Sequence, residues 1–371
     1  MNFAHIQREL DYYEKFRPTN FSEERTRFFE HLAKKEPYNP VFKYSDKLSI
    51  RDYEAIKGAL KKERDTDPVI NEFLRVYLDV VDTMIAWKQN NYEYLTSISG
   101  KIFGSTTEFD VSQTIREYKK LNMLTHASRE VYNDKQIGQK FLEEFKTRKL
   151  KGWFVEYHEA SGGNVSIYES DKKVVIKTGA VETRIGMECV LCHELDGHAI
   201  QAFNAMSNKK YRKWLMAYLG TEKQYEGYAT FVVINNLSIS HIISELIYNF
   251  ILVIATAQAQ TASFYETFQV IYKLCQDKNF SFSGAYKAKR GFQDTAQPGC
   301  FQKENAYVLG ALEIIKLIEE SKDNYYRLSQ GCFPLSANRF MDNQKPKWIS
   351  VKNFNKENLE YFKSKMETVK K

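Results

Sequence analysis

The spacing of hydrophobic residues in the first third of the chain is that of amphipathic helices. In residues 71–89, NEFLRVYLDVVDTMIAWKQ, apolar side chains such as Phe73 and Tyr77 recur at three-to-four-residue spacing and share one helical face. Residues 36–46, EPYNPVFKYSD, interrupt this pattern with prolines and predict a loop or an extended segment. We therefore expect a helical region over residues 1–130.

The hydrophobic period changes in the second part of the chain. Residues 151–180 contain the short runs GWFVEYHEA, NVSIYES and KKVVIKTGA, whose β-branched and aromatic residues predict a small sheet of two to four strands. A long apolar-periodic stretch predicts a helix over 187–206, and a later helix is expected over 222–236. Residues 280–305 mix glycine, basic and aromatic residues and predict a long binding loop. The pattern indicates an α+β fold, predominantly helical, with a second domain over 131–371.

The charge of the chain is mildly basic. Its 54 Lys and Arg residues exceed its 47 Asp and Glu residues, which gives a formal net charge of +7. The lysine-rich pieces are scattered along the sequence, and this favours a solvated surface over a nucleic-acid groove. We expect no nucleic-acid partner, whereas an acidic protein tail is compatible with the charge.

Two further features bear on the compartment. The beginning of the chain, MNFAHIQRELDYYEKF, alternates charged and apolar residues without the pattern of a secretory signal, and the odd number of five cysteines favours reduced thiols. The apolar stretch 246–264 is interrupted by polar residues such as Asn249 and Gln258, which indicates a buried helix and no membrane span. We therefore expect a cytoplasmic protein.

One motif carries candidate chemistry. Residues 192–198 read CHELDGH, which resembles the His-Glu-x-x-His motif of zinc proteases with one extra residue. In a regular α-helix His193 and His198 would point about 140° apart. A π-bulge, a turn of about 4.4 residues, returns His198 to the face of His193, and such bulges gather at functional sites. Gly197 is permissive enough to suit this distortion.

Two other interpretations compete for these residues. Residues 189–193 read CVLCH, the spacing at which c-type haem is attached. Haem attachment belongs to exported proteins, and this chain shows no export signal. Cys189 and Cys192 have the i, i+3 spacing of a buried helical face, so they are expected to be core cysteines. A redox role for the two cysteines is a further alternative. Glu194 and His198 also have i, i+4 spacing, which suits an ordinary hydrogen-bonded helical pair or a different metal held by these two residues.

A catalytic zinc site explains more of these residues together. Such a site needs three protein ligands, often two His and one carboxylate, with a separate carboxylate as general base. His193 and His198 supply two candidate ligands, and Glu194 the candidate base. In TEKQYEGYATF, Glu226 is the candidate third ligand, because the adjacent Gly227 and a nearby alanine allow its helix to approach closely.

Three segments together resemble a known family. HELDGH, YEGYA and KRGFQDTAQPGCFQKENAYVLG (residues 289–310) resemble the tubulin tyrosine carboxypeptidase (MATCAP-like) family, whose bacterial relatives are labelled flavohaemoglobin expression-modulating QEGLA-motif proteins. The family pattern also has an Asn shortly after the second His, which is Asn204 in this chain. The resemblance covers about residues 36–335.

The resemblance implies a fold and a set of roles. The expected fold is a predominantly helical, zincin-like metallopeptidase with the small sheet before the metal-binding helix. The expected zinc ligands are His193, His198 and Glu226, and Glu194 is the expected base. An aromatic C-terminal residue, Tyr or Phe, is the substrate preference that the family implies.

The chain departs from the family pattern at three places. The Gln-Glu-Gly-Leu-Ala block reads YEGYA at 225–229, the Phe-Thr-Lys-Asp block reads FQKE at 301–304, and the Tyr-Leu-x-Gly block reads YVLG at 307–310. These changes leave the candidate ligands intact. Two extra tyrosines, Tyr225 and Tyr228, are expected to reshape the substrate pocket.

The sequence thus predicts a zinc-dependent carboxypeptidase. Recognition of a free α-carboxylate suits an arginine, for which Arg290 is the first candidate and Lys303 and Arg184 are the next. Tyr307 is a candidate hydrogen-bond donor to the tetrahedral oxyanion, or else a core tyrosine. A zinc endopeptidase, which needs an open cleft and no carboxylate clamp, and a non-catalytic regulatory protein with the same fold are the alternatives.

Overall fold

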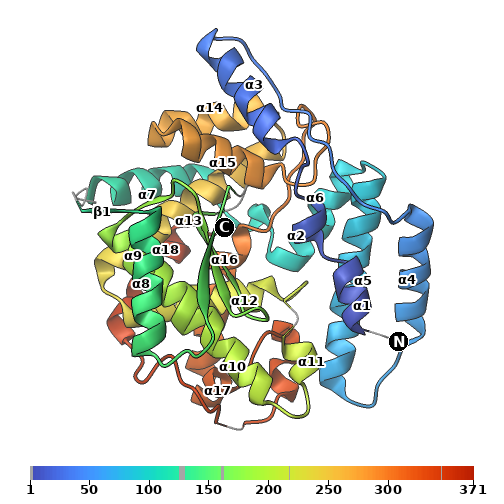
Figure 1. The fold of residues 1–371 in the computed structure, drawn as a ribbon, viewed down its shortest axis with the longest axis vertical. Helices are drawn as coiled ribbons and strands as arrows, with labels where there is room; N and C mark the ends of the chain where they lie inside the picture. The colour runs from blue at the N-terminus through green and yellow to red at the C-terminus, as the bar shows by residue number, and fades with distance from the viewer. Residues whose placement is uncertain (1–2, 125–129, 160–162, 217, 344) are drawn as a thin grey trace.

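The computed structural model describes residues 3–124, 130–159, 163–216, 218–343 and 345–371 (Figure 1). Its first part is helical, as the hydrophobic spacing predicts. The helix expected at 71–89 begins after the capping residue Asp67, has Pro68 at its first position and buries an apolar face. The helices of this part are α1 (Phe3–Glu9), α2 (Tyr12–Lys15), α3 (Phe21–Ala33), α4 (Ile50–Lys62), α5 (Pro68–Lys88), α6 (Tyr92–Phe103), the 3-10 helix η1 (Thr106–Glu108) and α7 (Val111–Leu124).

Two small sheets follow, where the sequence predicts one. The three-stranded sheet has the order β2-β4-β3, with β2 parallel and β3 antiparallel to the central strand β4. A separate antiparallel pair, β1 with β5, flanks it and has no counterpart in the prediction. The elements are β1 (Val131–Asn133), α8 (Asp134–Thr147), β2 (Phe154–His158), β3 (Val165–Tyr168), β4 (Lys173–Lys177) and β5 (Val181–Thr183).

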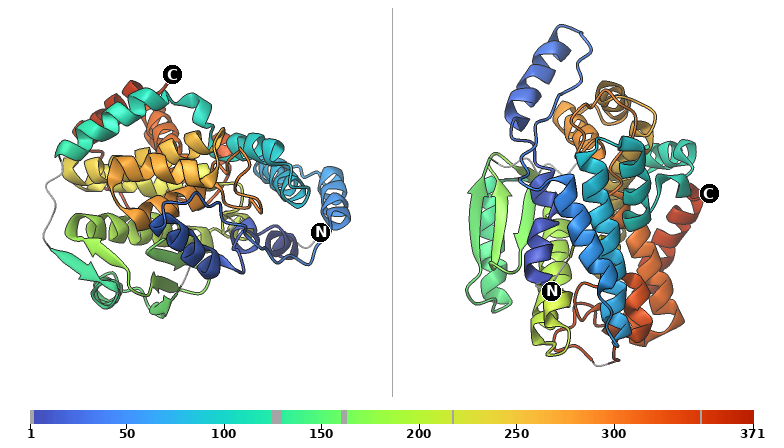
Figure 2. Two further views of the ribbon diagram at one scale, coloured as in Figure 1. Left: turned by 90° about the horizontal axis from the view of Figure 1, so that it is seen from above. Right: turned by 90° about the vertical axis from the view of Figure 1, so that its right-hand side faces the viewer.

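The three-stranded sheet belongs to its own small core. Val174 and Ile176 of β4 are fully buried and cluster with Phe141 of α8 and Leu195 of the following helix. Figure 2 (right) shows the sheet and α8 at one side of the helical body. The sheet therefore packs against the segment that carries the CHELDGH motif.

That segment is one continuous helix with a π-helical centre. It begins after Thr183, whose side chain accepts a hydrogen bond from the Gly186 N–H, and it contains the predicted range 187–206. Residues of the motif form the wide turns. The three parts, together called the metal helix, are α9 (Arg184–Leu191), η2 (Cys192–Ala199) and α10 (Ile200–Ser207).

The central helices of the body form the larger core. α12 (Glu222–Asn236) has the predicted bounds and packs along α16 (Asn305–Glu320), where Gly227 and Gly310 bring the two backbones together. α13 (Ile239–Ala259) is long and apolar enough to span a membrane by length and composition, but more than half of its most apolar window is buried inside the protein. This burial agrees with the expected core helix.

The predicted loop at 280–305 is wrong in its first part. α15 (Lys278–Ala288) occupies this part, because the Asp277 side chain accepts from the Phe280 N–H and because Phe282 and Gly284, on different sides of the helix, are both buried. Residues 289–304 form a loop. The remaining elements are α11 (Arg212–Leu215), α14 (Phe264–Cys275), α17 (Lys322–Leu328), the 3-10 helix η3 (Leu335–Phe340) and α18 (Lys356–Val369).

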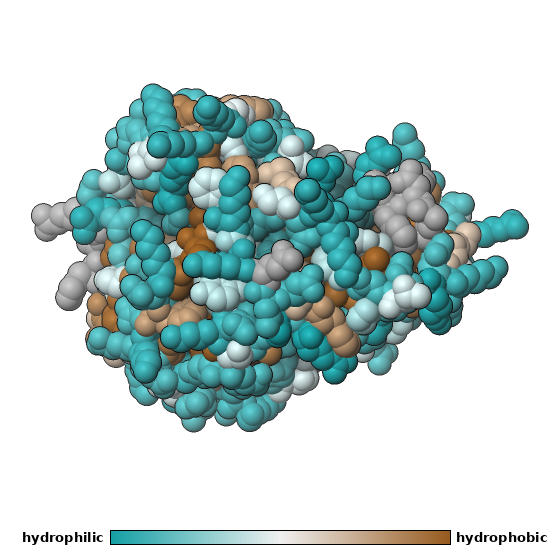
Figure 3. All heavy atoms as spheres, turned by 90° about the horizontal axis from the view of Figure 1, so that it is seen from below, coloured by the Kyte–Doolittle hydropathy of each residue, from teal (hydrophilic) through white to brown (hydrophobic). Residues whose placement is uncertain are grey.

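One face of the protein is largely polar. Figure 3 shows that the face seen from below is mostly hydrophilic, with small separate apolar patches. This distribution is typical of a solvated face.

Candidate metal centre

The extra residue of the CHELDGH motif is accommodated by a π-turn, as the sequence predicts. At the end of η2 the Ile200 N–H bonds to the carbonyls of Leu195 and Gly197, so it does not reach the Asp196 carbonyl that a regular α-helix would give it. The wider turn places the two imidazoles together. Their Nε2 atoms are 3.1 Å apart, although the residues are five positions apart.

The Glu226 carboxylate completes a triangle of ligand atoms. Glu226 Oε2 lies 3.3 Å from His193 Nε2 and 3.5 Å from His198 Nε2. A tetrahedral zinc site with bonds of about 2.0–2.1 Å holds its ligand atoms about 3.3 Å apart. The three residues therefore fit a metal ion of this kind, with one coordination position left open by the protein.

Small residues let the two ligand-bearing helices approach each other. A Cβ atom on Gly197 of the metal helix would lie 2.6 Å from the Cβ of Ala229 on α12. On another side of α12, a Cβ atom on Gly227 would lie 2.4 Å from the backbone of Gly310 in α16. Gly197 has helical backbone angles and is not among the positive-φ residues. Gly197 therefore lets the metal helix lie close to Ala229 of α12. The backbone freedom of glycine, which was expected from the sequence to ease the helix distortion, is not used.

Lys303 contacts the metal-site carboxylate directly. Its Nζ lies 2.7 Å from Glu226 Oε1 and donates to the Tyr307 hydroxyl at 2.7 Å, and the side chain is almost fully buried. Burial acts to raise the pKa of Glu226, but the Lys303 ammonium and the two imidazoles outweigh it and hold this pKa well below its usual range. The carboxylate is therefore ionised, as a metal ligand must be.

The pKa values of His198 and Glu194 are shifted in opposite directions in this site. Burial lowers the pKa of His198 to about 4, which keeps the imidazole in its metal-binding neutral form. Burial, with the Glu226 and Glu169 carboxylates, raises the pKa of Glu194 to about 8, against the opposing effect of His193. Glu194 is partly exposed beside the triad, and a carboxyl group with a pKa near the working pH is suited to move protons.

Aromatic side chains from distant segments form one wall of the site. The Tyr225 ring stacks on His198 with centroids 3.7 Å apart, and its hydroxyl donates to Glu169. Tyr218 stacks on Tyr225 at 6.0 Å, and Tyr13 of α2 follows at 5.5 Å from Tyr218. Tyr13, Tyr218 and Tyr225 are only partly buried, so each keeps some exposure to solvent. Only Tyr225 was predicted from the sequence.

The second tyrosine expected at the pocket lies elsewhere. Tyr228 is fully buried, and its hydroxyl forms a hydrogen bond with Ser329. It follows Glu226 by two positions on α12, and two helical steps rotate a side chain by about 200°, away from the ligand face. Tyr307 is near the triad, with its ring 6.0 Å from that of His193.

The structure separates the three cationic residues proposed for substrate binding. Arg290 is largely buried, with its guanidinium 3.9 Å from Glu304, which Lys287 also contacts at 3.3 Å. Lys303 lies in the site but is paired with Glu226. Arg184 is well exposed at the start of α9, and its ion-pair partners are Glu130 and Glu188, outside the triad.

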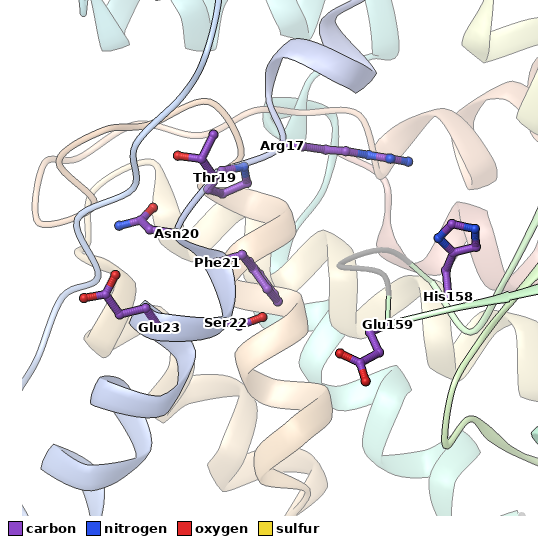
Figure 4. A pocket seen from close by; sticks show the side chains of 9 residues that line it. Arg17, Thr19, Asn20, Phe21, Ser22, Glu23, His158 and Glu159 are labelled. Carbon is purple, nitrogen blue, oxygen red and sulfur yellow. The ribbon is translucent and has the colours of Figure 1, made fainter.

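A surface depression lies apart from the triad. It has a volume of about 640 Å³ and lies between the start of α3 and the end of β2 (Figure 4). Arg17 and His158 are on its walls, and none of the three triad residues lines it. Arg17 donates from Nη2 to the Tyr168 hydroxyl at 3.1 Å, next to Glu169 of the aromatic wall. Its size alone does not make this depression the chemical centre.

The fold and the site together define a predominantly helical α+β protein with a candidate metal triad, whose two histidines lie on a π-distorted helix and whose carboxylate lies on α12. The model of the microtubule-associated tyrosine carboxypeptidase family matches residues 26–331, most of the chain. The protein belongs to this family, as the sequence resemblance indicates.

Short stretches of the chain are similar to individual curated proteins. MATCAP2 from Homo sapiens is 42% identical over 59 residues, which are 16% of this chain and 11% of that protein. Microtubule-associated tyrosine carboxypeptidase 1 from Mus musculus is 41% identical over 59 residues, 16% of this chain and 13% of that protein. The aligned stretches thus span about an eighth or less of the length of these relatives.

Proposed function

We propose that this protein is a zinc-dependent carboxypeptidase that removes a C-terminal aromatic residue, Tyr or Phe, from a peptide or protein. The observation that carries the proposal is the triangle of His193, His198 and Glu226, whose 3.1–3.5 Å edges suit tetrahedral zinc. Membership of a family described by tyrosine carboxypeptidase activity supplies the reaction class.

The chain's own residues account for the proton transfers. Zinc, when bound, supplies Lewis-acid polarisation and makes water more acidic. Glu194 accepts the proton of the attacking water and returns it to the leaving amine, a double role that suits a partly exposed carboxyl group adjacent to the ligand His193. The Tyr307 hydroxyl, beside His193 and oriented by Lys303, donates a hydrogen bond to the developing oxyanion.

Arg290 is the best candidate to bind the terminal carboxylate. Its guanidinium is 3.9 Å from Glu304 and therefore keeps hydrogen-bond donors for a second acid. Burial acts to lower the pKa of Arg290, but the Glu304 carboxylate and nearby tyrosines, including Tyr13 and Tyr307, raise it, so the group stays cationic. Lys303 is less suited, since its ammonium already serves Glu226 and Tyr307.

The aromatic wall supports the aromatic preference. Tyr13, Tyr218 and Tyr225 present partly exposed rings beside the triad, and an aromatic substrate side chain gains from edge-to-face or offset contacts with such rings. An acidic substrate tail agrees with the net charge of +7.

A library of peptides with random C-terminal residues tests the proposal. Zinc-loaded protein is incubated with the library, and mass spectrometry identifies the shortened products. We expect single-residue removal, fastest from peptides that end in Tyr or Phe. Internal cleavage of C-terminally amidated peptides would instead support an endopeptidase, and a stable zinc complex without any cleavage would support a regulatory protein.

A further inference from the structure

A C-terminal segment beyond the family match contacts the π-turn between the two histidines. The Ser350 hydroxyl donates to the Asp196 carbonyl, the group that the Ile200 N–H leaves when the helix widens. Ser350 lies outside the matched residues 26–331. A donor from another part of the chain thus satisfies a carbonyl of the distorted turn, which costs free energy when it is left without a partner.

The same segment is bonded to the metal helix at a second point. Asn204 donates from Nδ2 to the Trp348 carbonyl at 2.9 Å, and its Oδ1 accepts from the Trp348 N–H at 3.0 Å. Asn204 also donates to the Ser329 carbonyl at 2.8 Å, so both amide hydrogens are used. The side chain is almost fully buried, which makes these bonds expensive to lose.

The segment is also bonded to the helix of the third ligand. Asn236 Nδ2 donates to the Ser350 carbonyl at 3.0 Å, and Asn235 Nδ2 donates to the Asn353 carbonyl at 3.0 Å. Asn235 Oδ1 then accepts from the Asn355 N–H at 2.9 Å. Residues 348–355, called here the C-terminal clamp, therefore bond to both ligand-bearing helices.

We infer that Ser350 is a positioning residue of the metal centre. Its hydroxyl holds the π-turn in the form that aligns His193 with His198, and the rest of the clamp fixes this turn relative to Glu226. Metal affinity depends strongly on such supporting contacts, since a ligand triangle that is loosened by a few tenths of an ångström fits the ion poorly. The inference rests on the proposed zinc site and assigns a role to a segment that the family model does not cover.

Zinc affinity, measured by competition with a chromogenic chelator, tests this role. Ser350→Ala should bind zinc about 10- to 100-fold more weakly than wild type. Ser350→Thr keeps the hydroxyl and should restore most of the affinity. Ser350→Val has the shape of threonine without the hydroxyl and should behave like the alanine variant.

Ser207→Ala is the matched control. Ser207 lies on the metal helix, and its hydroxyl donates to the Phe203 carbonyl at 2.9 Å within that helix. The zinc affinity of the Ser207→Ala variant should therefore equal that of wild type. Melting temperatures of the metal-free proteins separate general stability from metal affinity. Equal zinc affinity in Ser350→Thr and Ser350→Val, even with a lower melting temperature in one of them, overturns the inference. Absence of zinc binding in wild type would instead overturn the proposed function.

Discussion

Gly197 of the metal helix lies directly against Ala229 of α12. A Cβ atom added to Gly197 would be 2.6 Å from the Ala229 Cβ and 2.8 Å from its Cα, closer than such atoms can lie. Gly197 precedes the ligand His198, and Ala229 is three positions after the ligand Glu226. The distance between these two small residues therefore sets the distance between the ligands on the two helices.

Gly197→Ala should consequently weaken both the fold and the zinc site. The added methyl group pushes the helices apart, at a cost of about 1–3 kcal/mol in unfolding free energy. Zinc affinity should fall by at least about tenfold, as for other changes that displace ligands. Gly58→Ala in α4 is the control, because a Cβ there meets nothing within 4 Å, and it should be neutral or stabilising. Unchanged zinc affinity in Gly197→Ala would argue against this distance constraint.

The three proposed ligands should be individually necessary for zinc retention. Purified wild-type protein should carry about one zinc per chain, and His193→Ala, His198→Ala and Glu226→Ala should each lose most of it, because two ligands make an incomplete site. Elemental analysis after extensive dialysis measures this content. Lys303→Met serves as a comparison, since it removes the ion-pair partner of Glu226 without removing a ligand. Its zinc content should fall less than that of the ligand variants. If two of the three ligand variants keep full zinc content, the assigned ligand set is wrong.

Arg290→Ala should impair cleavage of free-acid peptides selectively. A charge-assisted pair with the terminal carboxylate in this largely buried position contributes about 2–4 kcal/mol, which is roughly 30- to 1,000-fold in kcat/KM. Zinc content should stay unchanged. Amidation of the peptide should cause a similar loss in wild type and little further loss in the variant, because both changes remove one interaction.

The outcome for Arg290 also decides between the cationic candidates. A loss below about fivefold in Arg290→Ala, together with a large loss in Lys303→Ala, would transfer the role to Lys303. Arg184→Ala should leave kcat/KM unchanged, because Arg184 is exposed and contacts Glu130 and Glu188.

The buried carboxyl group of Glu222 should make the protein less stable as the pH rises. Burial raises its pKa from 4.5 to about 8 in the folded protein, where the Tyr12 hydroxyl bonds to it. Between pH 4.5 and pH 8 the folded state therefore holds a proton that the unfolded state has released, and stability falls across this range. Glu222→Gln removes this dependence, so its melting temperature relative to wild type should rise by a few degrees from pH 5 to pH 8. A difference that is the same at both pH values would contradict the assignment.

Much of the candidate site could be predicted because its residues are close in sequence or belong to local patterns. His193 and His198 share a single helix, and their five-residue spacing requires a π-turn if both are to reach one ion. The helix expected over 222–236 has the observed bounds Glu222–Asn236, and it carries Glu226.

The supporting residues could not be predicted, because tertiary contacts alone bring them together. Tyr13 lies 180 positions before His193, and Ser350 lies 152 positions after His198. Neither residue belongs to a motif. The interpretation of 280–305 as one loop failed for a related reason. Gly284 weakens the local helix signal, but it packs against Ile271, while Phe282 on another side of the helix packs against Phe28 and Phe264. This tertiary packing determines the structure.

Mass spectrometry of one defined peptide that ends in tyrosine tests the central claim most directly. The peptide, as free acid and as amide, is incubated with zinc-loaded wild type, with metal-free wild type and with zinc-loaded Glu194→Gln. We expect that zinc-loaded wild type removes the single tyrosine from the free acid, that the metal-free protein does not, and that Glu194→Gln is slower by about 10²- to 10⁴-fold while it retains zinc. Equal cleavage by the metal-free protein, or a Glu194→Gln activity close to that of wild type, would contradict the central claim.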